Sequence, residues 1–461
     1  MYAQKLDDME NLLAAIDLGT SVIRGMIVEK DEFGKMIILA TESEKTSENI
    51  IKKGAVANPD SVAFLVKQIL VKMMNTINNG RESDQKLELK KVYVGLNGES
   101  LQTIVKKSAR NFDGEITQEL VDELTKESSY VSNQDLDVLY VSPQEYILDD
   151  EEETSVVGCF CSNRIEGSSA LVVANKELKT RLQSAFKRAF QEGDVECEIV
   201  IQPIALADFL LTKYEKETGC LFIDFGAGTT SYAIYTNGYL RKVGTVGLGG
   251  NSVTKDLKDL KISFDDANLL KRKPFATCYP IMLEKPNTKV VFACADGMES
   301  IEVNTGTIGE IIQARMKEII NKIGYQAQFL GLSNIKTIVI SGGASKMHEL
   351  PELLAATFGM NIRRVWLKAK KSNPDFEKNI KRTLNILDNR VGNIVESNLD
   401  IEWLSVLGIL NGANESSVRK ENNSAKTKKT SKSRGSSLDI KGKLVGLFDN
   451  FFSEDESQRM N

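Results

Sequence analysis

Two glycine-bearing turns, each preceded by an aspartate, carry the residue types that could hold a phosphate group. In the first, LLAAIDLGTSVIRGMIVE at 12–29, apolar runs flank Asp17 and a short polar turn. This pattern predicts a strand, a tight turn and a second strand. The N–H groups and hydroxyls of such a turn can wrap phosphate oxygens, while the carboxylate faces a hydrated cation. Taken alone, the pattern also fits an ordinary hairpin.

The second turn repeats the order of the first. In CLFIDFGAGTTSYAIYTNGYLRKV at 220–243, an apolar strand leads to Asp224, a glycine-rich turn, two threonines and another apolar strand. Asn237-Gly238 is typical of a type I′ hairpin that closes the next pair of strands. Two turns of this kind, far apart in the sequence, predict two related halves that face each other.

A third glycine-bearing turn lies in KTIVISGGASKMHELPELLAATF at 336–358. A buried-looking strand runs into Gly342-Gly343 and is followed by a helix with apolar positions at helical spacing. Glycines at such a junction let a flat ligand approach the backbone closely. An ordinary strand-to-helix turn would look the same.

Together and in this order, the three turns resemble the actin, Hsp70 and sugar-kinase superfamily. The resemblance implies a two-lobed α/β fold of duplicated ribonuclease H-like domains, with ATP and Mg²⁺ bound in a cleft between the lobes. It implies phosphate contacts from Asp17, Gly19, Thr20, Ser21, Arg24, Asp224, Gly226, Gly228, Thr229 and Thr230. It implies adenosine contacts from Gly249, Gly250, Asn251, Arg315, Gly342 and Gly343.

Within this pattern, individual residues take different expected roles. Asp17 and Asp224 would hold Mg²⁺ through water, and Gln202 with Asp224 would act on the hydrolytic water. Arg24 falls where relatives often have a phosphate-contacting lysine, and an arginine keeps that charge with a different geometry. Arg315 matches a family arginine near the nucleotide, or it is a salt-bridge partner on a helix face.

Four segments between the turns, and one at the C-terminus, resemble one family in particular, the cell-division protein FtsA. The four are 92–102, 138–150, 246–257 and 307–319, and the C-terminal one is 436–452. FtsA is an actin relative that lacks subdomain 1B and carries an inserted subdomain 1C in its first half. The expected parts are an N-terminal extension at 1–11, subdomain 1A at 12–89 and 173–205, subdomain 1C at 90–172, subdomain 2A at 206–245 and 336–410, subdomain 2B at 246–335, a basic disordered linker at 411–435, an amphipathic helix at 436–452 and a polar tail at 453–461.

Two positions depart from the family pattern of the second turn. Ala227 stands where many relatives have a third glycine, and its methyl group should leave phosphate approach possible. Ser231 stands where many relatives have an acidic residue, and the missing carboxylate should affect hydrolysis more than binding. We therefore expect ATP to act mainly as a conformational and assembly ligand, with hydrolysis slow or absent.

The C-terminal segment is polar first and amphipathic afterwards. Residues 419–434 carry seven basic side chains and one acidic, with almost no apolar ones, which predicts a disordered linker. If residues 438–452 form a helix, at about 100° per residue, the apolar side chains fall on one half of its circumference. One lysine lies within this half, where its aliphatic stem could pack while its charged end reaches water. The members of this half are Leu438, Ile440, Lys441, Leu444, Val445, Leu447, Phe448, Phe451 and Phe452. Such a helix suits the surface of an anionic membrane, although docking on this protein or a partner fits the pattern too.

Composition narrows the function further. The net formal charge is −5, and His348 is the only histidine, so nucleic-acid binding and histidine-based catalysis are not expected. We expect a cytoplasmic, peripheral protein at the inner face of the cell membrane. The FtsA resemblance implies self-assembly into protofilaments, tethering of FtsZ to the membrane at the division site, and recruitment of later divisome membrane proteins. Alternatives on the same fold are a small-molecule kinase, an Hsp70-like chaperone and a pilus-assembly relative that binds a membrane-protein peptide.

Overall fold

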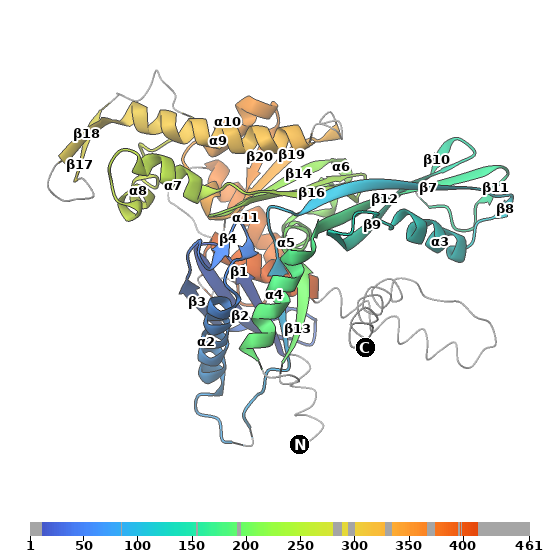
Figure 1. The fold of residues 1–461 in the computed structure, drawn as a ribbon, viewed down its shortest axis with the longest axis horizontal. Helices are drawn as coiled ribbons and strands as arrows, with labels where there is room; N and C mark the ends of the chain where they lie inside the picture. Colours follow the sequence, from blue (N-terminus) through green and yellow to red (C-terminus); the bar gives the residue numbers. More distant parts are fainter. Residues whose placement is uncertain are drawn as a thin grey trace. The chain divides into compact units, whose positions relative to one another are not determined.

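The computed structural model describes most of the chain between residues 12 and 413. The described ranges are 12–83, 85–153, 155–190, 195–279, 288–293, 300–327, 334–366, 374–394, 397 and 399–413. They form a mixed α/β protein whose larger compact unit contains 12–104, 131–142 and 170–410 (Figure 1).

The first half of the larger unit is built on a five-stranded sheet with the order β13-β6-β1-β2-β3. Its strands are β1 (Leu12–Leu18), β2 (Val22–Lys30), β3 (Met36–Lys45), β6 (Lys91–Leu96) and β13 (Glu196–Ile201). All seven residues of β1 are buried, because this strand lies in the middle of the sheet. Helices α2 (Pro59–Asn78) and α4 (Lys176–Ala189) pack on the sheet and on each other (Figure 1). The short strands β4 (Ile51–Lys52) and β5 (Ala55–Val56) precede α2.

The second half is built on another five-stranded sheet, with the order β16-β15-β14-β19-β20. Its strands are β14 (Cys220–Phe225), β15 (Thr230–Thr236), β16 (Tyr239–Val246), β19 (Thr337–Ser341) and β20 (Asn361–Arg364). The turn between β15 and β16 has positive φ at Asn237 (54°) and Gly238 (80°), as a type I′ turn requires. The predicted hairpin is confirmed.

The two sheets share one connection pattern. When the strands of each sheet are counted in chain order, the first pairs antiparallel with the second, and the second pairs antiparallel with the third. The first strand also pairs parallel with the fourth, and the fourth with the fifth. The predicted duplication of one α/β unit is therefore visible in the strand order and directions.

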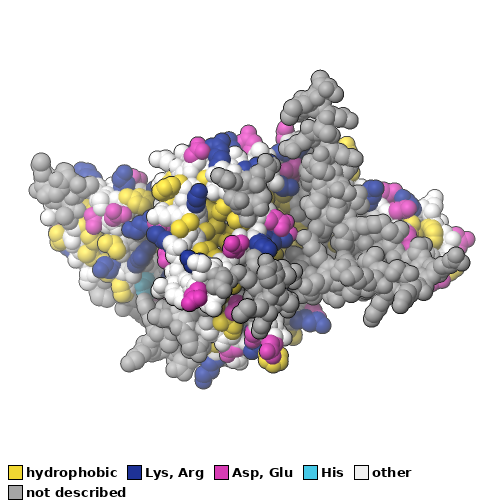
Figure 2. Space-filling model, turned by 90° about the horizontal axis from the view of Figure 1, so that it is seen from below, with side chains coloured by type: hydrophobic (Ala, Val, Ile, Leu, Met, Phe, Trp, Pro, Cys, Tyr) yellow, Lys and Arg dark blue, Asp and Glu magenta, His cyan; other side chains and the backbone are white. Residues whose placement is uncertain are grey.

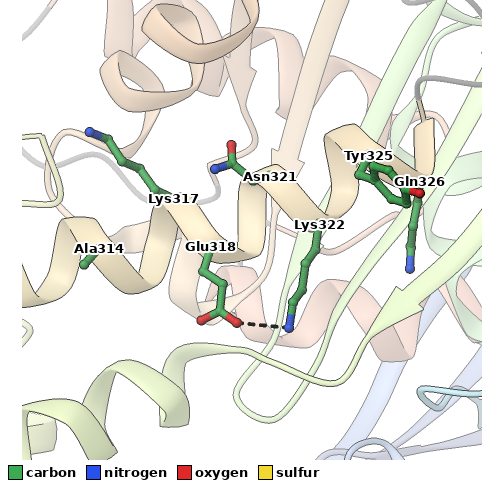
Figure 3. A pocket seen from close by; sticks show the side chains of 7 residues that line it. All are labelled: Ala314, Lys317, Glu318, Asn321, Lys322, Tyr325 and Gln326. Atoms are coloured by element: carbon green, nitrogen blue, oxygen red, sulfur yellow. Dashed lines mark ion pairs between the residues drawn. The ribbon is translucent and has the colours of Figure 1, made fainter.

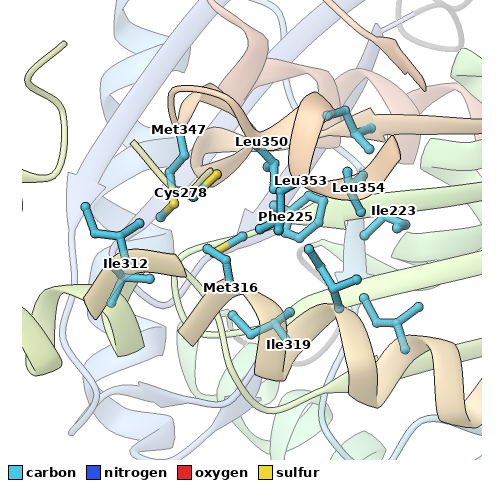
Figure 4. Close-up of a cluster of buried hydrophobic side chains, with 14 of the residues drawn as sticks. Ile223, Phe225, Cys278, Ile312, Met316, Ile319, Met347, Leu350, Leu353 and Leu354 are labelled. Atoms are coloured by element: carbon cyan, nitrogen blue, oxygen red, sulfur yellow. The ribbon is translucent and has the colours of Figure 1, made fainter. Parts of the chain in front are cut away.

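Helices around the second sheet enclose its hydrophobic core (Figure 4). Ile312, Met316 and Ile319 of α9 (Thr305–Ala327) belong to the same buried cluster as Leu350, Leu353 and Leu354 of α10 (Leu350–Phe358). The buried positions of α9 recur every three or four residues, which is the period of a helix with one face on a core. The remaining elements of this half are α5 (Gln202–Leu210), α6 (Lys213–Thr218), α7 (Gly250–Lys258), α8 (Phe264–Leu270), β17 (Lys289–Ala293), β18 (Ser300–Asn304), the 3₁₀ turn η3 (Gly343–Lys346) and α11 (Pro374–Asp388).

After the second sheet the chain returns to the first. The 3₁₀ turn η4 (Ile401–Trp403) leads into helical residues 404–413. A side chain added at Gly95 of β6 would lie 2.6 Å from Ile409 Cδ1, and one at Gly408 would lie 2.9 Å from Leu206 Cα. This last helix of the larger unit therefore packs closely against β6 and α5.

A second compact unit contains residues 105–130 and 143–169. A sheet with the order β10-β9-β12-β7 runs into it, and α3 covers a small apolar core. These elements are β7 (Gln102–Asn111), α3 (Gln118–Ser128), β9 (Leu136–Leu148), β10 (Glu151–Glu153) and β12 (Arg164–Asn175), with β8 (Gly114–Glu115) paired to β11 (Phe160–Cys161). Thr117 caps α3 by accepting from the backbone N–H of Leu120. The subdomain boundaries given above stay a prediction.

On the face shown in Figure 2, the visible basic and acidic side chains are interspersed among white and yellow surface. Among the described residues, no helix is both long and apolar enough to cross a bilayer. The linker and the amphipathic segment predicted at 411–452 lie almost wholly outside the described residues, as do all nine predicted membrane-binding side chains.

Candidate functional site

Asp17 and Asp224 occupy equivalent places in the two sheets. Each is the second-to-last residue of the central strand of its sheet, which is β1 for Asp17 and β14 for Asp224. Asp17 is 6% exposed and Asp224 is 9% exposed. The turns that follow them touch: a Cβ added at Gly228 would lie 2.5 Å from Thr20 Oγ1. The structure thus brings together the two turns that the sequence places far apart.

The two carboxyl groups resist ionisation in these positions. Burial raises the pKa of Asp17 to about 6, against the opposing effects of the Arg24 charge and a hydrogen bond from Gln202. Burial, and then the negative charge of Asp17, raises the pKa of Asp224 to about 7. Asp224 Oδ1 is buried without a hydrogen-bond partner among the described residues. Two neighbouring buried acids with a vacant acceptor would be relieved by a cation.

Gln202 begins α5 and reaches the first of these acids. Its Nε2 donates to Asp17 Oδ1 over 3.0 Å, and the side chain is buried. The residue predicted to orient a water molecule therefore lies directly beside the predicted cation ligand. Its amide oxygen remains for other partners, since an amide carries both donors and an acceptor.

The start of α7 lines the second turn. Gly250 N donates to Gly226 O over 3.0 Å, and Asn251 N donates to Ala227 O over 2.7 Å. A side chain at Gly249 would meet the same two carbonyl groups at 2.7 Å. Glycine is thus needed where this helix begins, because nothing larger fits between it and the turn.

Asn251 also reaches across to the first turn. Its Nδ2 lies 3.3 Å from Ser21 Oγ, to which it can donate, and its Oδ1 lies 3.5 Å from the same hydroxyl, from which it can accept. Thr230 Oγ1 is already used, because it donates to Leu248 O over 2.9 Å. Thr229 and Gly19 lie in the two turns as predicted from the sequence.

Gly342 brings the third turn against the second. Its φ is 88°, a conformation that side chains rarely adopt, and an added Cβ would lie 2.6 Å from Asp224 Oδ1. Gly343 begins η3 at the end of β19. Gly342 thus lies against both the backbone and the carboxylate of the second turn, and the expected approach of a flat ligand to this junction stays a prediction.

Arg24 has a partner that the sequence did not indicate. It pairs with Asp17 in the register of β1 and β2, and its Nη2 forms a 2.9 Å ion pair with Glu402. Its guanidinium carbon lies 5.8 Å from the ring centre of Trp403. Lys346 of η3 binds the same glutamate at 3.1 Å. Glu402 thus lies between a cation of the first sheet and one that follows the second sheet.

Arg315 is held by a carboxylate on α7. Its Nε and Nη2 bind the two oxygens of Asp256 at 2.7 and 2.8 Å, and it also pairs with Glu318. These hydrogen bonds, most of all those to Asp256, raise the pKa of Arg315 above the ordinary value of an arginine. Of the two alternatives left open by the sequence, this arrangement favours the salt-bridge partner.

Two further residues near the site had no motif to indicate them. Asn97 donates to Ser231 Oγ over 2.8 Å and accepts from Thr245 Oγ1 over 2.8 Å, so it engages the serine hydroxyl noted above as a departure from the family pattern. Lys271 of the turn after α8 donates to Gly250 O and Thr254 Oγ1 at 3.0 and 2.7 Å. Burial, and then the charge of Arg272, lowers the pKa of Lys271 to about 8.

The donor set suits a hydrated Mg²⁺ ion. Carboxylate and hydroxyl oxygens are the ligands that this ion prefers, and it keeps several of its waters. Among the described residues, no group of three or more His, Cys, Asp and Glu side chains could hold a metal ion directly. Asp17 and Asp224 would therefore hold the ion through water, and the unpartnered Asp224 Oδ1 is an acceptor for such a water.

A hollow on the outer side of α9 is not a comparable site. It is lined only by residues of that helix, from Ala314 to Gln326, and its carboxylate Glu318 pairs with Lys322 at 3.0 Å (Figure 3). Its side chains point outward from one helix and do not converge on a common point. The two aspartate turns remain the candidate site.

Comparisons with known proteins indicate which family the chain resembles. The family described as "Cell division protein FtsA" matches residues 221–378, which contain the second turn, α7 and the third turn. A cell-division protein FtsA from Porphyromonas gingivalis is 28% identical over 349 residues, which cover 74% of this chain and 70% of that protein. The predicted resemblance to FtsA is confirmed. A second FtsA, from Neisseria meningitidis, is 25% identical over 377 residues, covering 78% of this chain and 84% of that protein.

A solved structure shows the same fold. The structure described as a PilM–PilN type IV pilus biogenesis complex matches with a TM-score of 0.56 at 16% identity. The match covers 87% of this chain and 98% of that one. The predicted two-lobed, actin-like ATPase fold is thereby confirmed, and the relatives that the chain resembles are described as cell-division proteins.

Proposed function

We propose that this FtsA relative binds ATP with Mg²⁺ between its two aspartate turns and uses the nucleotide to control its assembly. The observation that supports this proposal is the meeting of the two turns around Asp17 and Asp224. Backbone N–H groups and hydroxyls of 19–21 and 226–230 would contact the phosphates. The Mg²⁺ ion would neutralise phosphate charge beside the two carboxylates, through water.

The adenosine would lie along the glycines that surround the second turn. Gly249 and Gly250 begin α7, and Gly342 and Gly343 follow β19, so backbone without side chains lines both edges. Asn251 and Arg315 belong to the same region, although Arg315 is engaged by Asp256. A flat base could approach such backbone closely.

Hydrolysis would be slow or absent. The Ser231 hydroxyl is engaged by Asn97 and supplies no carboxylate, and the amide of Gln202 is bound to Asp17. Gln202 and Asp224 are nevertheless the residues that would act on a hydrolytic water. The nucleotide would therefore serve as a ligand that stabilises one arrangement of the two halves.

We further propose that the chain forms protofilaments at the division site, on the inner face of the cytoplasmic membrane. The basic linker and the amphipathic segment at 436–452 would bind anionic lipid, and an array of such tails would bind more tightly than one. The FtsA relatives support FtsZ and later divisome proteins as partners, with subdomain 2B, about 246–335, as the expected FtsZ contact.

Two experiments test these proposals separately. Calorimetric titration of the full chain with ATP, in Mg²⁺ and then in EDTA, should show binding that depends on Mg²⁺. An absence of ATP binding in both buffers would refute the nucleotide proposal.

The membrane proposal is tested by sedimentation with anionic liposomes, comparing the full chain with a variant truncated after Arg434. Only the full chain should pellet with lipid, and less of it should pellet at high salt. If both chains stay in solution or bind alike, the tail is a docking helix. The pilus-type and kinase alternatives would then be reopened.

A further inference from the structure

Two buried polar atoms at the ends of β14 and β19 lack hydrogen-bond partners in the described part of the chain. They are Asp224 Oδ1 and Ser341 Oγ. Ser341 is 1% exposed, so bulk water does not satisfy its hydroxyl. Unpartnered buried polar atoms are uncommon in folded proteins, and two of them at neighbouring strand ends call for a shared explanation.

The two residues are direct neighbours in the sheet. Asp224 and Ser341 are Cα partners in the parallel pairing of β14 with β19, and Ser341 is the last residue of its strand. Paired residues on adjacent strands direct their side chains to the same face, and the strands lie about 4.8 Å apart. Ligands of open α/β sheets bind outside this carboxyl end of the strands.

The other buried serines in the described part of the chain are partnered, which makes Ser341 distinctive. Ser345, only four residues on, donates to Gly342 O over 2.7 Å. Ser169 in the second unit accepts from Ser128 Oγ over 2.7 Å. A hydroxyl that stabilises the fold forms a hydrogen bond in the unliganded protein. The hydroxyl of Ser341, in contrast, uses neither its donor nor its acceptor capacity within the described residues.

A cation-bound water would satisfy both orphan atoms. Such a water has two hydrogens to donate, and Asp224 Oδ1 and Ser341 Oγ are two acceptors at the same strand ends. We propose that Ser341 is a positioning residue of the cation site, whose hydroxyl, beside Asp224 Oδ1, orients a water bound to the Mg²⁺ ion of the nucleotide. This proposal rests on the nucleotide function proposed above, and it adds a residue that is not among the phosphate, adenosine and cation contacts expected from the sequence.

The test compares Ser341→Ala with Ser341→Thr, which keeps the hydroxyl, in the full chain. Ser169→Ala serves as the matched control, because it removes a buried serine hydroxyl that has a partner. For each protein, the melting temperature is measured without nucleotide. ATP affinity is then titrated at increasing Mg²⁺ concentration and in EDTA.

Ser341→Ala should melt at the same temperature as the wild type or higher, because it removes an unsatisfied buried group. The Mg²⁺ concentration that gives half-maximal ATP binding should rise about five- to tenfold, the effect of one lost hydrogen bond. Its ATP affinity in EDTA should not change, and Ser341→Thr should behave like the wild type. Ser169→Ala should melt lower with an unchanged Mg²⁺ requirement.

An unchanged Mg²⁺ requirement in Ser341→Ala would overturn the proposal, whatever its melting temperature. A lowered melting temperature with that result would show that the hydroxyl serves the fold. If the wild type itself binds ATP without any Mg²⁺ dependence, the cation site fails and the role of Ser341 fails with it. That outcome is distinguishable, because it appears before any variant is made.

Discussion

Replacing Asp224 by asparagine should stabilise the nucleotide-free protein while it weakens Mg²⁺-dependent ATP binding. The carboxyl group is buried beside another acid, and its pKa of about 7 lies far above the ordinary value of 3.8. The folded protein therefore disfavours the ionised form. Asparagine has nearly the same shape and no charge, so it removes this cost.

The magnitude follows from the linkage between proton binding and folding. A group whose folded pKa is raised contributes stability that is present below the unfolded pKa and is lost as pH rises through the folded pKa. For Asp224 the loss runs from about pH 4 to about pH 7 and amounts to about 4 kcal/mol, at 1.36 kcal/mol per pH unit. Between pH 5.5 and 7.5, the advantage of Asp224→Asn over the wild type should grow by about 2 kcal/mol.

Urea denaturation at pH 5.5, 6.5 and 7.5, without nucleotide or Mg²⁺, measures this difference. Comparing the variant with the wild type at each pH removes the contribution of every titrating group that Asp224 does not influence, and Asp17, whose charge acts on Asp224, is the neighbour whose titration changes with it. Calorimetry on the same samples should show that the variant binds ATP in Mg²⁺ about ten- to a hundredfold more weakly, as expected for a lost hydrogen bond to a charged group.

A control of opposite sign is available in the second unit. The backbone N–H groups of Ser162, Arg164 and Asn163 donate hydrogen bonds to the carboxylate of Asp149. These hydrogen bonds, most of all the one from Ser162, lower the pKa of Asp149 below its ordinary value. Asp149→Asn should therefore destabilise the protein near neutral pH. If the advantage of Asp224→Asn were the same at all three pH values, the argument from buried charge would be refuted.

Three further substitutions test other contacts. Gly228→Ala places a methyl group against the first turn and should lower the free energy of unfolding by about 1–3 kcal/mol in urea titrations, so unchanged stability would contradict the contact. Glu402→Gln should change stability by less than about 1 kcal/mol, because the pair is partly exposed, but it frees Arg24 and should strengthen ATP binding in calorimetry. Arg363→Met removes the buried partner of Glu215 and leaves its carboxylate only the half-exposed Arg382, so the free energy of unfolding should fall by up to about 3–5 kcal/mol in urea titrations. A loss below about 1 kcal/mol would mean that Arg363 is not needed to balance this buried charge.

The parts of the site that were predictable share a local signal. Asp17 and Asp224 each stand at the junction of an apolar strand and a glycine turn, and the repeated order of these features predicted the duplicated fold. Strand pairing follows from the same alternation of apolar runs and turns. The Asn237-Gly238 hairpin was predictable because two residues alone determine its backbone.

The parts that were not predictable depend on partners far away in the sequence. Arg24 and Glu402 are 378 positions apart, and Asn97 and Ser231 are 134 apart, so no window contains both members of either pair. The role of Ser341 depends on a hydrogen bond that is missing, which only coordinates reveal. Such pairings are set by how the two sheets meet.

The return of the chain to the first sheet has a mechanical consequence. Helical residues 404–410 pack against β6 and α5, and the turn just before them holds Glu402 against Arg24, whose strand partner is Asp17. The chain continues from this helix to residue 414 and the predicted tail. Tension applied along that tail would be borne first by this helix and next by the ion pair beside the candidate site. The helix from which the predicted tail continues is thus linked to the first aspartate turn through Glu402 and Arg24.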